Sequence, residues 1–285
     1  MAYKHSVKKL INYTLVLVFL LLSSGLTLYA QTTSDSLKPK MKMVKEVLYK
    51  PENGEIKSRE DLFDSELNSY KKYDKNEKIV ETGQYETDGS VYEKTFYERD
   101  EKGKALKAIQ KNASGQVKSY WTYIYDEEGN MIEVNTYDQN NKLIKIQSNK
   151  YDEKGNNVEM IIKSPENENG WKYIYKYNFD NKLIERNRYM PDGSLKDRRT
   201  YAYDKDGNEN LQYKFNPDGS FIKFVSEYDE MNNLTVQKWF NELDKQIHQT
   251  SFEYIYDDNG NWISKRRISN GKLGMVWERN IEYYE

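Results

Sequence analysis

Tyrosines recur at a fixed spacing, and this period constrains the fold more than any other feature of the chain. Tyr125, Tyr151, Tyr177 and Tyr203 lie 26 residues apart. Tyr228 and Tyr256 continue the series with slips of one or two residues, and a second aromatic series runs between them, at Tyr85, Tyr137, Tyr189, Phe215 and Phe240. The basic unit is therefore about 13 residues long, and such a short period indicates repeated copies of one small supersecondary unit.

A turn residue recurs within each unit. Four residues after each unit start the chain has Gly or Asn at twelve of fourteen positions, namely Glu77, Gly89, Gly103, Gly115, Gly129, Asn141, Gly155, Asn181, Gly193, Gly207, Gly219, Asn232, Asp244 and Gly260. Gly and Asn tolerate a positive φ better than other residues do. The pattern predicts a tight hairpin turn in every unit, with Gly129, Gly155, Gly207 and Gly260 as structural turn residues.

Between the turns, residues alternate in the way that strands require. Trp121 to Tyr125 and Trp171 to Tyr177 place aromatic rings at every second position, which is the period of a β-strand. We expect an all-β fold, an antiparallel meander of ~13-residue half-units with a 26-residue period. Roughly sixteen strands fit between Met41 and Glu285. They should form one elongated, curved sheet, spiralling or partly closed, with the aromatic rows on one face and the Lys, Glu, Arg and Asn side chains on the other.

The first thirty residues have the pattern of a secretory signal peptide. Three lysines precede the apolar run 14–22, and small residues lead to Ala30 before Gln31. An uncleaved membrane anchor is the competing interpretation, because residues 10–30 approach the length of a spanning helix. We expect a signal peptide at 1–30, a disordered lead-in at 31–40 and a β-repeat domain at 41–285. The mature protein would have no membrane span and would be exported to the periplasm, the outer cell surface or the medium.

Composition narrows the function. The chain has no Cys, so disulfides, thiol catalysis and Cys-ligated zinc are excluded. Lys plus Arg is 44 and Asp plus Glu is 46, which gives no basic footprint for nucleic acid. His248 is the only histidine after the signal region, and no nucleophile or carboxylate pair is signalled. Asp204 to Asn208 could suggest calcium, but its Gly spacing does not match an EF-hand and fits a turn better. We therefore expect no catalytic residue, no metal and no cofactor.

Several turn segments resemble a known repeat. The six-residue segments 125–130, 151–156, 203–208 and 256–261 each read Tyr-Asp-x-x-Gly-Asn and resemble the YD repeats of the RHS family. That resemblance implies a bacterial exported protein with β-strand repeats, and members of that family include carbohydrate-linked proteins and shells around toxins. The segments 190–195 and 216–221 also resemble MORN-like repeats.

The aromatic rows support one functional hypothesis. Tyr and Trp present a flat apolar body with a polar tip, and on an open sheet face they could stack on sugars. Six residues would form the ligand-binding platform: Trp121, Tyr123, Tyr125, Trp171, Tyr173 and Tyr175. The alternative is a structural or protein-interaction module in which cross-strand aromatic pairs are only the hydrophobic layer of the sheet. The expected partner is a polysaccharide or an envelope protein.

Overall fold

The described part of the chain is all β-structure. The computed structural model describes residues 39–51, 68–86 and 88–285, so the expected signal peptide and all but the last two residues of the expected lead-in lie outside it. Residues 40–285 form one compact unit. Its strands are β1 (Met41–Tyr49), β2 (Ser69–Tyr73), β3 (Ile79–Tyr85), β4 (Val91–Arg99), β5 (Ala105–Asn112), β6 (Val117–Tyr125), β7 (Met131–Asp138), β8 (Leu143–Tyr151), β9 (Asn157–Lys163), β10 (Trp171–Tyr177), β11 (Leu183–Tyr189), β12 (Leu195–Tyr203), β13 (Glu209–Phe215), β14 (Phe221–Tyr228), β15 (Leu234–Phe240), β16 (Gln246–Tyr256), β17 (Trp262–Ser269) and β18 (Lys272–Tyr283).

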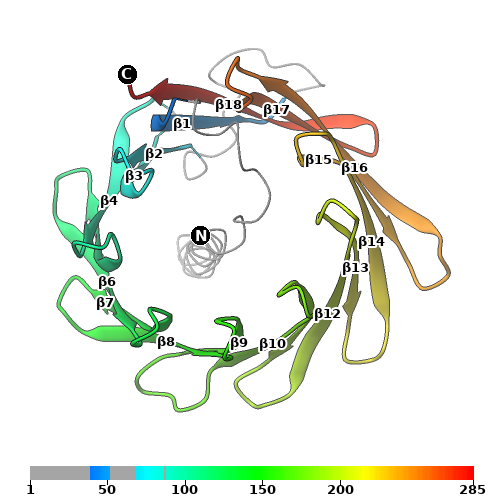
Figure 1. Ribbon diagram of the computed structural model, residues 1–285, viewed down its shortest axis with the longest axis horizontal. Coiled ribbons are helices and arrows are strands. Elements are labelled where there is room, and N and C mark those ends of the chain that lie inside the picture. The colour runs from blue at the N-terminus through cyan, green and yellow to red at the C-terminus, as the bar shows by residue number, and fades with distance from the viewer. Residues whose placement is uncertain (1–38, 52–67, 87) are drawn as a thin grey trace, which may run out of the picture. The chain divides into compact units, whose positions relative to one another are not determined.

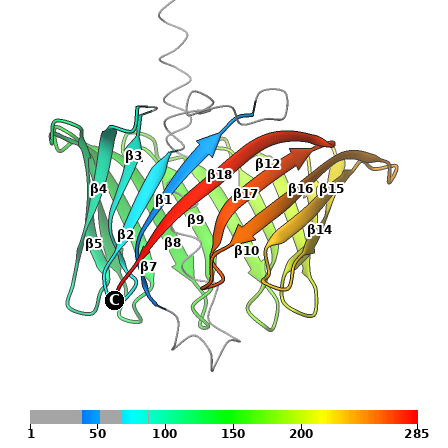
Figure 2. The same ribbon diagram turned by 90° about the horizontal axis from the view of Figure 1, so that it is seen from above.

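These strands form a closed barrel. Each strand pairs antiparallel with its neighbours in sequence, and β1 pairs with both β2 and β18. Figure 1 looks down the ring of strands, and Figure 2 shows them tilted between two rims. The meander is confirmed, but the expectation of an elongated, spiralling or partly closed sheet is wrong, and the strand number is eighteen instead of about sixteen. Twist and tilt bring the first strand beside the last, and closure pairs the backbone groups that an open sheet would leave free at its edges.

The closing seam has its own side-chain contacts. Leu48 lies opposite Trp277 and is fully buried, and its N–H donates to Asn68 Oδ1 at 2.9 Å. Glu46 and Arg279 also face each other across the seam, with Arg279 Nε 2.7 Å from Glu46 Oε2. The first and last strands are therefore joined by both apolar packing and an ion pair.

The hairpin turns share one geometry. In the turn after β6, the N–H of Gly129 donates to Asp126 O at 3.1 Å, and the N–H of Asn130 donates to Asp126 Oδ1 at 2.7 Å. All fourteen turn positions singled out above have a positive φ, including Glu77 at 60° and Asp244 at 58°. The four glycines named as structural turn residues have φ of 90° at Gly129, 78° at Gly155, 90° at Gly207 and 78° at Gly260.

Strand register assigns each side chain to one of two faces. Trp121 lies opposite Ala108 on one side and Thr136 on the other, and all three are buried. On the opposite face of the same strands Ile124 is exposed. Closing a sheet crowds the side chains on its concave face and spreads those on its convex face, so the face of Trp121 is the inner face of the barrel.

A row of tyrosine hydroxyls joins the strand ends at one rim. Each hydroxyl donates to a backbone carbonyl 19 or 20 residues earlier, at the start of the preceding strand. The bonds run from Tyr125 to Ala105, Tyr151 to Met131, Tyr177 to Asn157, Tyr203 to Leu183 and Tyr228 to Glu209, at 2.8–2.9 Å. Arg99 replaces the tyrosine in its unit, and its Nη2 donates to Ile79 O at 2.8 Å. We call these five tyrosines the tyrosine ladder; it explains why the residue recurs at this place.

No helix in the described ranges has the length and apolar character needed to cross a bilayer.

Candidate binding surface on the inner face of the barrel

The inner face carries all five tryptophans of the chain. The register places Trp121 opposite Ala108, Trp171 opposite Ile162, Trp239 opposite Phe224, Trp262 opposite Tyr256 and Trp277 opposite Leu48. The tryptophan side chains thus lie on one face, as the alternation predicts. Polar and charged residues share that face with them, however, so the expected separation into an aromatic face and a charged face is wrong.

The six residues proposed from the sequence all lie on this inner face, but in two groups. Trp121, Tyr123 and Tyr125 are on β6. The other three, Trp171, Tyr173 and Tyr175, are on β10. Strands β7, β8 and β9 separate the two groups. The six rings therefore do not make one continuous platform.

The two groups differ in exposure. Trp121 and Tyr123 are only 7% and 8% exposed, and the hydroxyl of Tyr125 belongs to the tyrosine ladder. Trp171 is 37% exposed, and Tyr173 and Tyr175 are half-buried, with ring centroids 6.4 Å apart and nearly parallel planes. The β6 group is part of the packed wall, whereas the β10 group is the part that a ligand can reach.

Arginines lie beside the β10 group, and the sequence analysis missed them. Arg188 forms an ion pair with the fully buried Asp197, and its guanidinium lies 5.7 Å from the centroid of the Trp171 ring. Arg186 Nη2 is 3.9 Å from the other oxygen of Asp197. Arg199, on the next strand, donates from Nη1 to Gln212 Oε1 at 3.0 Å. Arg186 and Arg188 thus flank the Asp197 carboxylate, and the charge of Asp197 also acts on Arg199.

Register aligns several of these cations in a single row. Tyr175 lies opposite Arg186, Arg186 opposite Arg199, and Arg199 opposite Lys214. Like charges directly opposite each other destabilise a sheet. Burial and the charge of Arg186 lower the pKa of Arg199 below its ordinary value. Burial raises the pKa of the nearby Glu209 carboxyl, while the charges of Arg199 and Arg186 act on it in the opposite direction. The row thus places the three basic side chains of Arg186, Arg199 and Lys214 in line beside the aromatic rings.

The sequence did contain one indication of these arginines, their alternation along the strands. Arg186 and Arg188 alternate along β11, and Arg199 lies on β12. Deciding that they face the same way as Tyr175 requires the cross-strand register, which the sequence alone does not provide.

The outer face has a different character, with ion pairs at mid-strand. Glu159 on β9 is held by Lys150 and Lys172 of the two flanking strands, each at 2.7 Å. Lys176 and Glu185 are 2.8 Å apart, and Lys238 and Glu227 are also 2.8 Å apart. These charges lie on the face opposite to that of the tryptophans, which they share with exposed apolar side chains such as Ile124.

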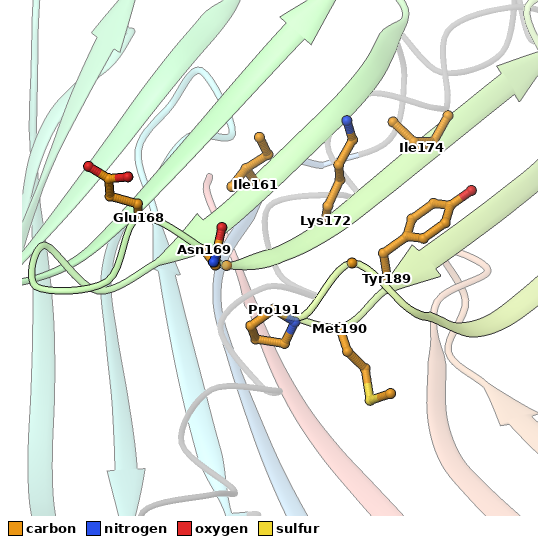
Figure 3. A pocket seen from close by; sticks show the side chains of 10 residues that line it. Ile161, Glu168, Asn169, Lys172, Ile174, Tyr189, Met190 and Pro191 are labelled. Atoms are coloured by element: carbon orange, nitrogen blue, oxygen red, sulfur yellow. The ribbon is translucent and has the colours of Figure 1, made fainter.

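An open pocket of about 410 Å³ lies on the outer face of β9–β11. Figure 3 shows its floor of Ile161, Lys172 and Ile174, bordered by Tyr189 and by Met190 and Pro191 of the next turn. The ammonium of Lys172 is already paired with Glu159. The floor of the pocket is apolar apart from Lys172, whose charge is balanced by Glu159. These groups do not indicate a particular class of ligand.

Within residues 39–51, 68–86 and 88–285, no group of three or more His, Asp or Glu side chains is placed to hold a metal ion. His248 Nε2 lies 3.0 Å from Thr250 Oγ1, and its ring lies 4.6 Å from that of Trp239. The histidine therefore sits in a packed aromatic contact on the inner face.

Comparison with known proteins gives weak likenesses only. No family model matches the chain, and no curated protein matches it. Among solved structures, a porin-like protein from Bacteroides uniformis has 10% identity and a TM-score of 0.44 over 86% of this chain and 98% of that one. A porin-like protein from Bacteroides vulgatus has 12% identity and a TM-score of 0.33 over 86% and 99%. The Tc holotoxin pore of Photorhabdus luminescens has 10% identity and a TM-score of 0.29 over 85% of this chain and 17% of that one. These TM-scores are too low to support a functional conclusion. The resemblance to YD repeats stays a local one, carried by the turn segments.

Proposed function

We propose that this protein is an exported, non-enzymatic binding module that takes a carbohydrate chain on the inner face of its barrel, at the β10 aromatic group. The observation that carries the proposal is the exposure of Trp171 beside the half-buried Tyr173 and Tyr175 on a face where Trp121 and Tyr123 are buried. Exposed flat rings with polar tips suit stacking on sugar faces.

The size of the barrel supports this placement. Barrels of ~16–18 strands are too wide for their own inward side chains to fill. Inner-face polar groups at β10–β12 also keep partial exposure, with the Arg186 and Arg188 side chains 25% and 31% exposed. A polymer with alternating apolar faces and hydroxyls suits such a mixed surface better than a globular protein partner does.

The outer face favours work in water rather than within a bilayer. A Lys or Arg on the lipid-facing side of a β-barrel costs about 2–4 kcal/mol at the bilayer midplane. Lys150, Lys172 and Glu159 form a three-strand cluster on this barrel's outer face. We therefore propose an aqueous envelope compartment or the cell surface as the place of action.

The buried aromatic rings favour a second candidate function. Because Trp121 and Tyr123 are packed in the wall, the aromatic rows also fit a purely structural or protein-interaction module. The two candidates differ in what the loss of Trp171 changes: binding if the ring stacks on sugar, stability if it is core.

The experiment compares wild type, Trp171→Ala and Phe179→Ala on a panel of immobilised polysaccharides, with a melting temperature for each. Phe179 is 94% exposed in the turn after β10, so it is a matched exposed ring away from the inner face. We expect at least one polysaccharide to retain wild type and Phe179→Ala, and Trp171→Ala to lose retention with little change in melting temperature. Retention of wild type by no polysaccharide, or undiminished retention of Trp171→Ala, would overturn the proposal.

A further inference from the structure

The inner face next to Trp171 carries more positive charge than its own residues neutralise. Arg186, Arg188 and Arg199 face two carboxylates, Asp197, which pairs closely with Arg188, and Glu209, whose charge acts on Arg186 and Arg199. Lys214 extends the row opposite Arg199. The Nε–H groups of all three arginines are buried without a hydrogen-bond partner within the described chain.

Such a row is unfavourable in an isolated protein. Arg186 and Arg199 are direct cross-strand neighbours, and like charges so placed repel each other. A negative charge held between the two guanidinium groups would offset this repulsion.

Guanidinium chemistry narrows the class of anion. Arginine binds planar or tetrahedral oxyanions through paired N–H donors, as in carboxylates, sulfates and phosphates. Trp171 adds a ring face on which a sugar can stack, 5.7 Å from the Arg188 guanidinium. A sugar ring that bears an acidic group would therefore meet both features at once.

We infer that the cationic row of Arg186, Arg199 and Lys214, beside Trp171, is a binding site for an acidic polysaccharide whose sugars carry carboxylate or sulfate groups. This inference rests on the proposed carbohydrate function and specifies its substrate class. Arg188 keeps Asp197 neutralised, while Arg186, Arg199 and Lys214 contact the acidic groups of the polymer.

The test is affinity electrophoresis in gels that contain polygalacturonate, dextran sulfate or neutral dextran. The variants are Arg199→Gln and Arg186→Gln, which leave the close Arg188–Asp197 pair in place. The matched control is Arg266→Gln, an arginine on the outer face that is 52% exposed. The melting temperature of each variant is measured in parallel.

We expect wild type and Arg266→Gln to be retarded by at least one acidic polymer, and Arg199→Gln and Arg186→Gln to bind it about tenfold more weakly, a loss of about 1.4 kcal/mol. The melting temperature of Arg199→Gln should hold or rise, because the substitution removes a repulsion; a purely structural arginine would lower it. The two acidic polymers distinguish a carboxylate ligand from a sulfate ligand.

The remaining outcomes contradict the inference. If Arg266→Gln weakens binding as much as the inner-face variants do, the polymer is attracted by the overall charge of the protein and not by a site. If Arg199→Gln and Arg186→Gln bind as well as wild type, the cationic row is not part of the binding site. Retardation by neutral dextran alone would overturn the acidic specificity and leave the carbohydrate function standing. Retardation in none of the three gels, together with no retention on the wider panel, would overturn both.

Discussion

At the scale of single residues, the fold depends on a backbone position more than on any side chain. Fourteen turns place one residue at positive φ, and the chain meets that demand with Gly at nine of them and Asn at three. The two remaining positions, Glu77 and Asp244, adopt the same conformation, so the turn geometry tolerates other residues at a cost in strain. The Asp or Asn that starts each of these turns accepts backbone N–H bonds that hold the turn in place, Asp74 from Lys78 and Asn241 from Lys245, and these bonds explain that tolerance.

Substitution at Gly219 should isolate this strain. Gly219 has φ of 88° and an added Cβ would meet no atom within 4 Å, so Gly219→Ala should lose about 1 kcal/mol of unfolding free energy through backbone strain alone. Gly219→Asn should lose less, since Asn141 and Asn181 occupy the same place in other units. Gly274→Ala is the control, because Gly274 has no positive φ and its Cβ would make only an ordinary contact at 3.7 Å. Denaturant melts measure all three; equal losses at Gly219 and Gly274 would refute the account of the turns.

At the scale of the strand, the tyrosine ladder explains a composition that is otherwise unusual. Each ladder tyrosine ends one strand and donates its hydroxyl to the start of the strand before it, close to the neighbouring turn. Arg99 makes the equivalent bond in its own unit. The recurrent aromatic is therefore first a structural joint between units. Only tyrosines outside the ladder, such as Tyr173, are free to serve a ligand.

Removing one ladder hydroxyl should have a pH-dependent effect. Tyr177→Phe deletes the 2.9 Å bond to Asn157 O and should cost about 0.5–1.5 kcal/mol near neutral pH. Burial, and then the charge of Asp152, raises the pKa of Tyr177 to about 12. The folded state thus favours the neutral phenol, so the contribution of Tyr177 is fully present below pH ~10 and falls as pH rises toward 12.

The stability difference between wild type and Tyr177→Phe should therefore shrink as the pH is raised above about 10. Chemical melts at a series of pH values measure it. Tyr213→Phe is the matched control, since no described residue accepts a hydrogen bond from the Tyr213 hydroxyl and the substitution should be nearly neutral at pH 7. An equal loss in both variants, or a difference that does not change with pH, would argue against the ladder.

Local structure could be predicted from the sequence, and long-range structure could not. The turns and strands follow from the positions of Gly, Asn and alternating aromatics, which act within a few residues. Closure depends on β1, Met41–Tyr49, which lies before the first of the recurring turns. The arginines beside Trp171 could not be predicted for a similar reason. Their alignment depends on the cross-strand pairing of Arg186 with Tyr175 and Arg199, which the sequence does not specify.

At the scale of the whole molecule, closure gives the two faces of the sheet different roles. The outer face carries mid-strand ion pairs such as Lys176–Glu185, and the inner face carries the tryptophans and the cationic row. A barrel of this width can keep polar groups on its inner face, because that face is not a dry core. Every assignment of a residue to the inner or outer face rests on the pairing of β1 with β18.

A designed disulfide tests that pairing most directly. Lys45 and Asn280 are exposed cross-strand partners at the seam, and such Cα pairs lie within the span of a disulfide. The chain has no Cys, so in Lys45→Cys/Asn280→Cys only the two new thiols can react. Lys45→Cys/Lys150→Cys is the control, since β8 does not pair with β1. After mild oxidation of the monomer, mass spectrometry should find the disulfide-linked peptide in the first variant and free thiols in the second. Free thiols in both variants, or equal disulfide yields, would contradict the closed barrel.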